Sequence, residues 1–348
     1  MRRTRSASAT IEGVAARAGV SRQTVSNVLN APERVSPHTA ERVRRAIAEL
    51  HYRPHWAARR LRTRTSRTIG FRIQPSGPPV LGSLIDRFLH ALTSQAWNAG
   101  YRLLLFTQAS GDDERATYDE LSATGTVDGF VIYDLRIGDR RPPWLAQRSI
   151  PFACFGRPLG SSTAARYAWV DVDGALGIAQ AVDYAVSRGH RRIAYLGWHP
   201  GTCCGDDREQ GWHRAMRRHR LDTAGLHSES ADELAAGTDA ARRLLAGDDP
   251  PTAFVCASDT LAVGARLASQ VGVQVVGFDD SPVVSLLQPP MSSVRQPLED
   301  VARAIVRLLL EQLDGNTTAE GVLLPPQLIV RDGQQPAGQQ KIEKSTGS

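Results

Sequence analysis

The N-terminal fold is decided by residues 10–30, whose sequence is TIEGVAARAGVSRQTVSNVLN. Thr10 can cap a helix whose apolar residues recur on one face, namely Ile11, Val14, Ala15 and Ala18. Gly19 can adopt the positive φ of a tight turn, and Ser21 can cap a second helix over residues 22–29. Two short helices joined by a glycine turn predict a helix-turn-helix.

The second predicted helix carries polar side chains on its outer face. Arg22 and Gln23 open that helix, and Asn27 lies one turn further on. Arginine can bind the edge of guanine with two hydrogen bonds, and glutamine or asparagine can do so with adenine. This row therefore predicts contacts to DNA bases, with ordinary solvated positions as the alternative. A third helix, from Ser36-Pro37 through Leu50, is predicted to pack on the first two.

The positive charge of the chain is concentrated near its N-terminus. Residues 1–67 hold fifteen arginines against four acidic residues, an excess of eleven positive charges, whereas the whole chain has a net charge of +6. The remaining residues are therefore acidic by five charges. A small cationic head on a mildly acidic body is typical of a protein that binds nucleic acid, because arginines near phosphates release counterions.

Several classes of protein are disfavoured by what the sequence lacks. It has no run of about 18 apolar residues and no apolar segment after its basic N-terminus, so neither a membrane protein nor a secreted one is expected. Its four cysteines show no C-x-x-C spacing, which favours reduced cytoplasmic thiols over a zinc site or disulfides. Nucleophile elbows, phosphate loops and histidine clusters are missing, so we expect no enzyme, no metal and no cofactor.

Residues 11–30 closely resemble the N-terminal signature of the lactose/galactose repressor (LacI/GalR) family, through Ile11-x-x-Val14-Ala15-x-x-Ala18-Gly19-Val20-Ser21-x-x-Thr24-Val25-Ser26-x-Val28-Leu29-Asn30. The resemblance implies that Arg22, Gln23 and Asn27 contact bases in the major groove. It also implies that four further residues hold phosphates or brace the helix, namely Ser21, Thr24, Ser26 and Asn30.

The resemblance continues through Leu50-x-Tyr52-x-Pro54 into residues 55–61, HWAARRL. It implies that this segment is a hinge helix that folds on the operator, and it adds Tyr52, Ala57 and Leu61 to the expected DNA contacts. Leu61 matches a leucine wedged into the minor groove, where an apolar side chain unstacks a base step. Packing within a linker is the alternative for Leu61.

The remainder of the chain alternates apolar runs of strand length with helical stretches. The runs occupy residues 68–73, 101–106, 129–132, 152–155, 193–196, 253–256 and 275–278. The first two helices are expected near residues 82–99 and 112–124. Buried strands that alternate with helices predict parallel sheets covered on both faces, and such sheets bind ligands at the carboxyl ends of their strands.

The body also resembles the same family and, through it, the periplasmic sugar-binding proteins. The matching motifs include Arg208-x-x-Gly211-Trp212, Ser258-Asp259-x-x-Ala262 and Val276-Gly277-Phe278-Asp279-Asp280. The fold class implied is an all-α helix-turn-helix head with a hinge helix, followed by a periplasmic-binding-protein-like α/β body of two parallel-sheet subdomains. The chain is expected to cross between the subdomains more than once, with a cleft between them.

Five residues are implied as contacts to an effector in that cleft. Arg208, Asp279 and Gln296 match effector contacts of the family. Ser258 stands where an amide is common, and Trp169 where an aromatic ring often stacks on the ligand. Guanidinium, carboxylate and amide groups around an apolar ring suit a sugar, because a sugar needs many hydroxyl partners and one flat face. Plain core packing is the alternative for Trp169, and a cap of the following helix is the alternative for Asp259, next to Ser258.

Two stretches depart from the family pattern. After Phe155 the family usually has an aspartate at an effector-contact position, whereas this chain has Gly156 and then Arg157. Residues 269–274 lack the usual Pro-x-Asp segment, which implies a shortened surface loop. Both departures leave the identity of the effector open.

The predicted organisation is a helix-turn-helix domain over residues 1–54, a hinge helix and linker over 55–67, an effector-binding and dimerisation domain over 68–333, and a disordered tail over 334–348. The tail has no apolar heptads, so a homodimer is expected. The predicted function is that of a cytoplasmic transcription regulator, most simply a repressor. It would bind a roughly palindromic double-stranded operator and respond to a small-molecule effector, expected to be a carbohydrate. The alternatives are a solute-binding protein without a role in transcription and an orphan regulator without an effector.

Overall fold

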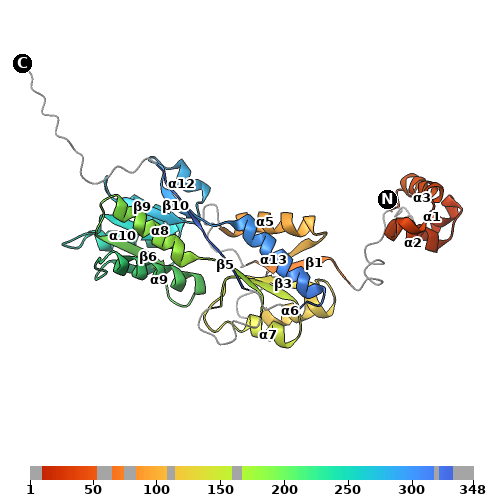
Figure 1. Cartoon of the computed structure of the whole chain (residues 1–348), viewed down its shortest axis with the longest axis horizontal. Coiled ribbons are helices and arrows are strands. Elements are labelled where there is room, and N and C mark those ends of the chain that lie inside the picture. Colours follow the sequence, from red (N-terminus) through yellow and green to blue (C-terminus); the bar gives the residue numbers. More distant parts are fainter. Residues whose placement is uncertain are drawn as a thin grey trace, which may run out of the picture. The chain divides into compact units, whose positions relative to one another are not determined.

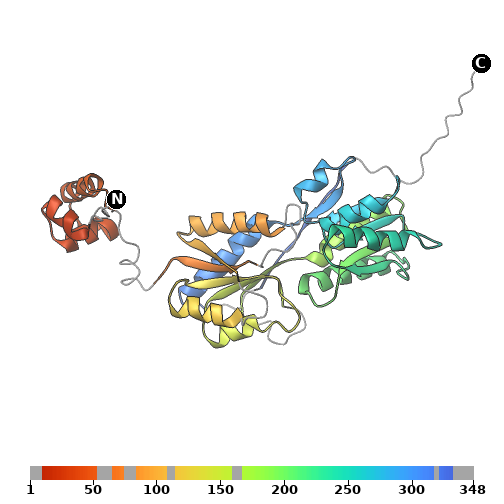
Figure 2. The same cartoon turned by 180° about the vertical axis from the view of Figure 1, so that it is seen from behind.

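The computed structural model describes residues 10–52, 65–73, 84–107, 114–158, 167–316 and 321–331 (Figures 1 and 2). The chain divides into two compact units, Met1–Ser66 and Arg67–Ser348, which we call the head and the body. No helix among the described residues is both long and apolar enough to cross a membrane.

The described part of the head consists of short helices around a small core. Its helices are α1 (Ile11–Ala18), α2 (Arg22–Asn30), the 3-10 turn Pro32–Arg34 and α3 (Pro37–Glu49). Each α-helix begins after a hydroxyl residue whose side chain accepts a hydrogen bond from a backbone N–H of the first turn, namely Thr10, Ser21 and Ser36. Gly19 ends α1 with a φ of 62°, in the left-handed region. These features confirm the predicted helix-turn-helix.

One valine from each α-helix meets the others in the core of the head. Val14, Val25 and Val43 are fully buried. The guanidinium of Arg42 braces the turn between α1 and α2, because its Nη2 donates to the carbonyls of Ala18 and Gly19 at 2.6 and 3.2 Å. The outer face of α2 is thus left for polar side chains.

The body contains two sheets, and we call each sheet with its helices a lobe. The first lobe has the strand order β11-β5-β4-β3-β1-β2, with every neighbouring pair parallel. Its strands are β1 (Thr68–Arg72), β2 (Arg102–Phe106), β3 (Gly129–Ile132), β4 (Phe152–Phe155), β5 (Trp169–Val172) and β11 (Gly321–Leu324).

Helices cover both faces of the first sheet (Figures 1 and 2). Two of them, α5 (Leu84–Asn98) and α13 (Leu298–Leu313), lie side by side on one face and share a core with β1 and β5. The helices α6 (Glu114–Ala123) and α7 (Arg141–Gln147) lie on the other face, where Tyr118, Phe130 and Leu145 are buried together. This arrangement places the carboxyl ends of the strands at one edge of the lobe.

The second lobe has the strand order β12-β10-β9-β8-β6-β7. Its strands are β6 (Ile193–Trp198), β7 (His227–Ser230), β8 (Ala253–Cys256), β9 (Gln274–Phe278), β10 (Ser292–Arg295) and β12 (Gln327–Ile329). All neighbouring pairs are parallel except β10 and β12, which are antiparallel. The sheet therefore has one antiparallel edge, a detail that the sequence did not predict.

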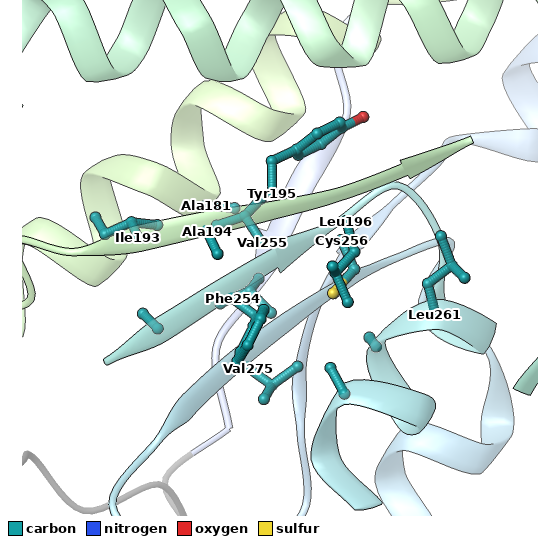
Figure 3. Close-up of a cluster of buried hydrophobic side chains, with 14 of the residues drawn as sticks. Ala181, Ile193, Ala194, Tyr195, Leu196, Phe254, Val255, Cys256, Leu261 and Val275 are labelled. Carbon is teal, nitrogen blue, oxygen red and sulfur yellow. The ribbon is translucent and has the colours of Figure 1, made fainter. Parts of the chain in front are cut away.

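The helices of the second lobe pack in pairs. Its helices are α8 (Gly174–Ser187), α9 (Cys203–Arg218), α10 (Leu234–Leu245), α11 (Asp259–Ala268) and α12 (Pro282–Leu286). The pairs are α8 with α9 and α10 with α11. Figure 3 shows the core, in which Phe254 and Val275 project from one side of the sheet and Tyr195 from the other. The ring of Tyr195 stacks on that of Trp212 in α9, with the ring centroids 5.8 Å apart.

The chain crosses between the lobes three times. It passes from β5 to α8, from β10 to α13, and from β11 to β12. Each lobe is therefore made of segments that are far apart in the sequence, as the resemblance implied. The crossings also bring the carboxyl ends of β5 and β10 next to the other lobe.

Candidate DNA-binding and ligand-binding sites

The outer face of α2 is a row of polar side chains. Ser21, Arg22 and Gln23 are exposed, whereas Val25 and Val28 on the opposite face are buried. The row is held in order by local hydrogen bonds, because the Ser21 hydroxyl accepts from the Thr24 backbone N–H at 3.1 Å and lies 2.9 Å from the Thr24 hydroxyl. The N-terminal turn of α2 is thus exposed and internally ordered.

The side chains predicted to contact bases are held by weak, exchangeable contacts. Nε2 of Gln23 donates to Oδ1 of Asn27 at 2.9 Å, and Nε of Arg22 lies 3.1 Å from Oε1 of Glu12. The Arg22 and Glu12 side chains are both more than half exposed, so their ion pair contributes little to stability. A base edge can therefore replace these partners at small energetic cost.

Tyr52 differs from the other head residues predicted to contact DNA. Its side chain belongs to the core of the head, with 9% of its surface exposed, and burial raises the pKa of its hydroxyl. The ring of Tyr52 thus stabilises the core of the head. Ser26 lies half-buried on α2, and Asn30 is the last residue of that helix. Ala57 and Leu61 lie outside the described residues, and so does the side chain of Asn30.

The candidate ligand site in the body is built around Arg208 of α9. Arg208 is 5% exposed, and its guanidinium carbon lies 3.7 Å from the ring centroid of Phe278 and 5.1 Å from that of Trp198. Its Nη1 donates to the carbonyl of Ala257, directly after β8. Its Nη2 lies 3.8 Å from Oδ1 of Asp279, directly after β9. The guanidinium is thus fixed between two aromatic rings and two strand ends.

Asp279 and Gln296 complete this group. Oδ1 of Asp279 accepts a hydrogen bond from Nε2 of Gln296 at 2.7 Å. The backbone of Asp279 has a φ of 106°, a strained value for a residue other than glycine, and such strain is concentrated at functional sites. Burial raises the pKa of Asp279 to about 6, although Arg208 and Gln296 act in the opposite direction. The structure thus brings together three of the five predicted effector contacts.

Ser258 has a structural role next to that group. Its hydroxyl oxygen accepts from the Leu261 backbone N–H at 3.2 Å, so Ser258 caps α11, and its hydroxyl donates to Oδ1 of Asp232. Asp259 is therefore not the cap, contrary to the alternative drawn from the sequence. Its two carboxylate oxygens instead accept from the hydroxyl of Ser293 and the backbone N–H of Ser281, both at 2.6 Å.

Trp169 is not brought to the Arg208 group. It is the first residue of β5, at the end of the strand opposite to the carboxyl edge. Its ring lies over Gly321 of β11, where an added Cβ would come within 2.2 Å of the ring, and it packs on the core between the sheet and α6 and α7. The core alternative therefore describes Trp169 better than a stacking contact does.

Trp198 is the aromatic residue that sequence reasoning missed. It is the last residue of β6, at the carboxyl edge, and its ring faces the Arg208 guanidinium. Its Nε1 is buried without a hydrogen-bond partner in the described structure. Its position at the end of an apolar strand could have marked it as a site residue, just as the position directly after a strand marks Asp279. No group of three or more His, Cys, Asp or Glu side chains among the described residues is placed to hold a metal ion.

The head and the body of the chain each match a known protein family. Residues 10–55 match the family described as bacterial regulatory proteins, lacI family, and residues 182–333 match the periplasmic binding protein-like domain. The regulator CelR of Thermobifida fusca is 34% identical over 337 residues, covering 93% of this chain and 97% of that protein.

Two solved structures are similar to this chain over nearly its whole length. A complex of the transcriptional regulator CelR with cellobiose has a TM-score of 0.71 at 31% identity and covers 93% of this chain and 99% of its own. The lac repressor dimer bound to operator and the anti-inducer ONPF has a TM-score of 0.81 at 26% identity, and covers 94% of this chain and 100% of its own.

Proposed function

This chain belongs to the LacI family of bacterial transcriptional regulators. We propose that it is a repressor whose affinity for its operator is controlled by a carbohydrate bound beside Arg208. Proteins of this family are DNA-binding regulators and not enzymes, as the sequence led us to expect. The observation that carries the proposal is the coexistence of an exposed polar row on α2 with a buried, strained polar group at the strand ends of the body.

For DNA, we propose that α2 enters the major groove. Arg22, Gln23 and Asn27 would contact base edges, while Ser21, Thr24, Ser26 and Asn30 would hold phosphates or brace the helix. Leu61 stays a prediction for the minor groove, and Ala57 stays a predicted DNA contact. One head covers a half-site, so we propose a homodimer on a roughly palindromic operator, which is the form in which the lac repressor was solved.

For the effector, the chemistry of the site supports a neutral ligand with many hydroxyl groups. The carboxylate of Asp279, the amide of Gln296 and the guanidinium of Arg208 offer acceptors and donors at fixed positions. We propose that the Trp198 ring, rather than that of Trp169, supplies the flat apolar face. The solved complex of CelR with cellobiose makes a small oligosaccharide the first ligand to test.

The test begins with DNA that the purified protein captures from fragmented genomic DNA. Fluorescence anisotropy then compares a captured fragment with a scrambled one at physiological salt, where we expect a Kd lower by about 1,000-fold or more for the captured fragment. Equal affinity for both would contradict the proposal and favour a solute-binding protein without a role in transcription.

The ligand is tested in the same assay with cellobiose and a panel of other sugars. We expect one of them to change operator affinity, and Arg208→Ala to abolish that change while operator binding without ligand is kept. Loss of a charged hydrogen-bond partner should weaken ligand binding by about 2–3 kcal/mol. Arg214→Ala is the matched control, because Arg214 lies on the same helix with an exposed side chain that donates to the carbonyl of Gln210, one turn earlier. No response across the panel would favour an orphan regulator.

A further inference from the structure

An ion pair joins the two lobes beside the Arg208 group. Arg157 lies two residues after β4 in the first lobe, and its Nη2 lies 2.8 Å from Oδ1 of Asp207 in α9 of the second lobe. Its Nε lies 3.8 Å from Oδ2 of Asp171 in β5. The three side chains are 25%, 9% and 11% exposed, in that order. The two carboxylates are thus largely shielded from water and Arg157 is partly shielded, so loss of the pair costs more than loss of an exposed pair.

Asp207 is fixed from two sides. While Oδ1 faces Arg157, Oδ2 accepts a hydrogen bond from the backbone N–H of Ala175, in the first turn of α8, at 3.0 Å. Asp207 directly precedes Arg208, and both side chains pack against Gly174, where an added Cβ would come within 2.9 Å of Arg208 and 3.3 Å of Asp207. Arg157 therefore acts on the turn of α9 that carries Arg208.

The start of α9 also docks on the first lobe through its backbone. The N–H of Cys203 donates to the carbonyl of Leu135, and the N–H of Ile137 donates to the carbonyl of Gly201, both at 3.1 Å. The Cys203 side chain is buried in the core of the first lobe. These two amides report directly on whether α9 stays docked.

We propose that Arg157 is a positioning residue that ties the start of α9 to the first lobe, so that the lobes separate beside Arg208 when the pair with Asp207 is broken. The link to regulation rests on the proposed function, since it takes Arg208 as a ligand contact. The tie itself does not depend on any ligand or on DNA.

Two substitutions separate a tie from a general effect of charge. Arg157→Ala makes the site more negative, because Asp171 and Asp207 lose their partner. Asp207→Asn makes it more positive and keeps an oxygen that can accept from Ala175. A tie predicts that both variants loosen the docking of α9 in the same direction, and that the double variant is no looser than either single variant. A general effect of charge predicts opposite directions that cancel in the double variant.

The measurement is hydrogen exchange of the full chain without ligand, followed at the amides of Ile137 and Cys203. We expect exchange at both to become faster by about tenfold, which corresponds to ~1.4 kcal/mol, in each single variant. Amides of β8, between β6 and β9 in the sheet, monitor the fold and should be unchanged. The matched control is Arg218→Ala, which removes an arginine paired with Asp183 of α8 within the second lobe and should leave both amides as they are.

Unchanged exchange at Ile137 and Cys203 in both variants, with β8 still protected, would overturn the tie. So would opposite changes in the two variants. If exchange changes as expected but no sugar alters operator affinity, the tie stands and the proposed effector is wrong. If Arg157→Ala fails to fold, Asp207→Asn alone decides, since it keeps the contact with α8.

Discussion

Burial changes the pKa of two carboxyl groups at and near the candidate ligand site, those of Asp279 and Asp171. Burial raises the pKa of each carboxyl group to about 6, even though an arginine lies next to each of them. Asp171 is the second-last residue of β5, and Asp279 directly follows β9, so both lie near the carboxyl edges of their sheets. The site therefore holds its carboxylates at an energetic cost, as expected of groups kept for binding rather than for stability.

This cost predicts a dependence of stability on pH. Because the folded-state pKa of Asp171 lies above the ordinary value of 3.8, the folded protein keeps a proton that the unfolded chain releases between pH 4 and 6. The contribution of Asp171 to stability is thus largest below about pH 4 and is lost as the pH rises through about 6. Asp171→Asn should flatten this part of the curve by on the order of 2 kcal/mol, as measured by urea unfolding from pH 4.5 to 7.5. Parallel curves for the two proteins would contradict the assignment.

A second prediction at this scale concerns Arg22. Arg22→Ala should relax base preference at one position of each half-site and weaken operator binding by about 1–3 kcal/mol. Competition binding against single-base variants of the operator measures both effects. Glu12→Gln is the control, since it removes the ion pair with Arg22 but keeps the guanidinium, and should leave base preference unchanged. An equal loss on operator and scrambled DNA would make Arg22 a phosphate contact.

The two tryptophans mark the limit of what the sequence could predict about the site. The resemblance identified Arg208, Asp279 and Gln296, which the structure brings together. It placed Trp169 beside a ligand by matching position along the chain, but the ring is turned to the core of the first lobe. The end of an apolar strand was a signal for Trp198, but its nearness to Arg208 depends on how α9 packs on β6, which no local pattern in the sequence expresses.

At the scale of elements, the helices α8 and α9 approach each other closely through their backbones, on the helix pair that carries Arg208. An added Cβ at Gly211 would lie 2.5 Å from the carbonyl oxygen of Ala175, so only glycine permits this contact. The same two helices are joined by a hydrogen bond from the backbone N–H of Ala175 in α8 to the carboxylate of Asp207 in α9. The spacing between α8 and α9 therefore sets the positions of Asp207 and Arg208.

Gly211→Ala should force the two helices apart and destabilise the body. Overpacking of this kind costs about 1–3 kcal/mol, which urea unfolding at neutral pH can measure. Gly247→Ala is a suitable comparison, because an added Cβ there would meet nothing closer than the carbonyl oxygen of Leu244 at 3.7 Å. A Gly211→Ala variant as stable as the wild type would show that α8 and α9 can shift freely.

Most strands that are apolar and fully buried were predicted, whereas the polar strands were missed, and so were β5, β11 and β12. The bounds expected for β3, β4 and β8 are those observed, since each is a short apolar run that is buried from end to end or nearly so. By contrast, β7 and β10 have the sequences HSES and SSVR and were not predicted. Ser292 and Ser293 are fully buried in β10 because Arg331 and Asp259 satisfy their hydroxyls, and these partners are distant in the sequence.

At the scale of the whole molecule, the expected assembly is a homodimer. We expect sedimentation velocity to show a dimer, and a variant that ends at Gly333 to sediment as a dimer as well. The reason is that residues 334–348, which lie outside the described residues, have no apolar heptad repeat to join dimers into tetramers. A stable tetramer that the shortened variant fails to form would show that the tail assembles the protein.

The three crossings between the lobes also constrain the order in which the protein becomes functional during synthesis. The three α-helices described in the head are complete once residue 52 has left the ribosome, whereas the first sheet gains its outer strand β11 only with residues 321–324. A chain released before Leu298 would lack α13, which covers one face of that sheet. Such a fragment would carry α2 but no finished lobe to sense a metabolite or to pair with a second copy, so we expect premature termination to leave a single head that cannot span a palindromic operator.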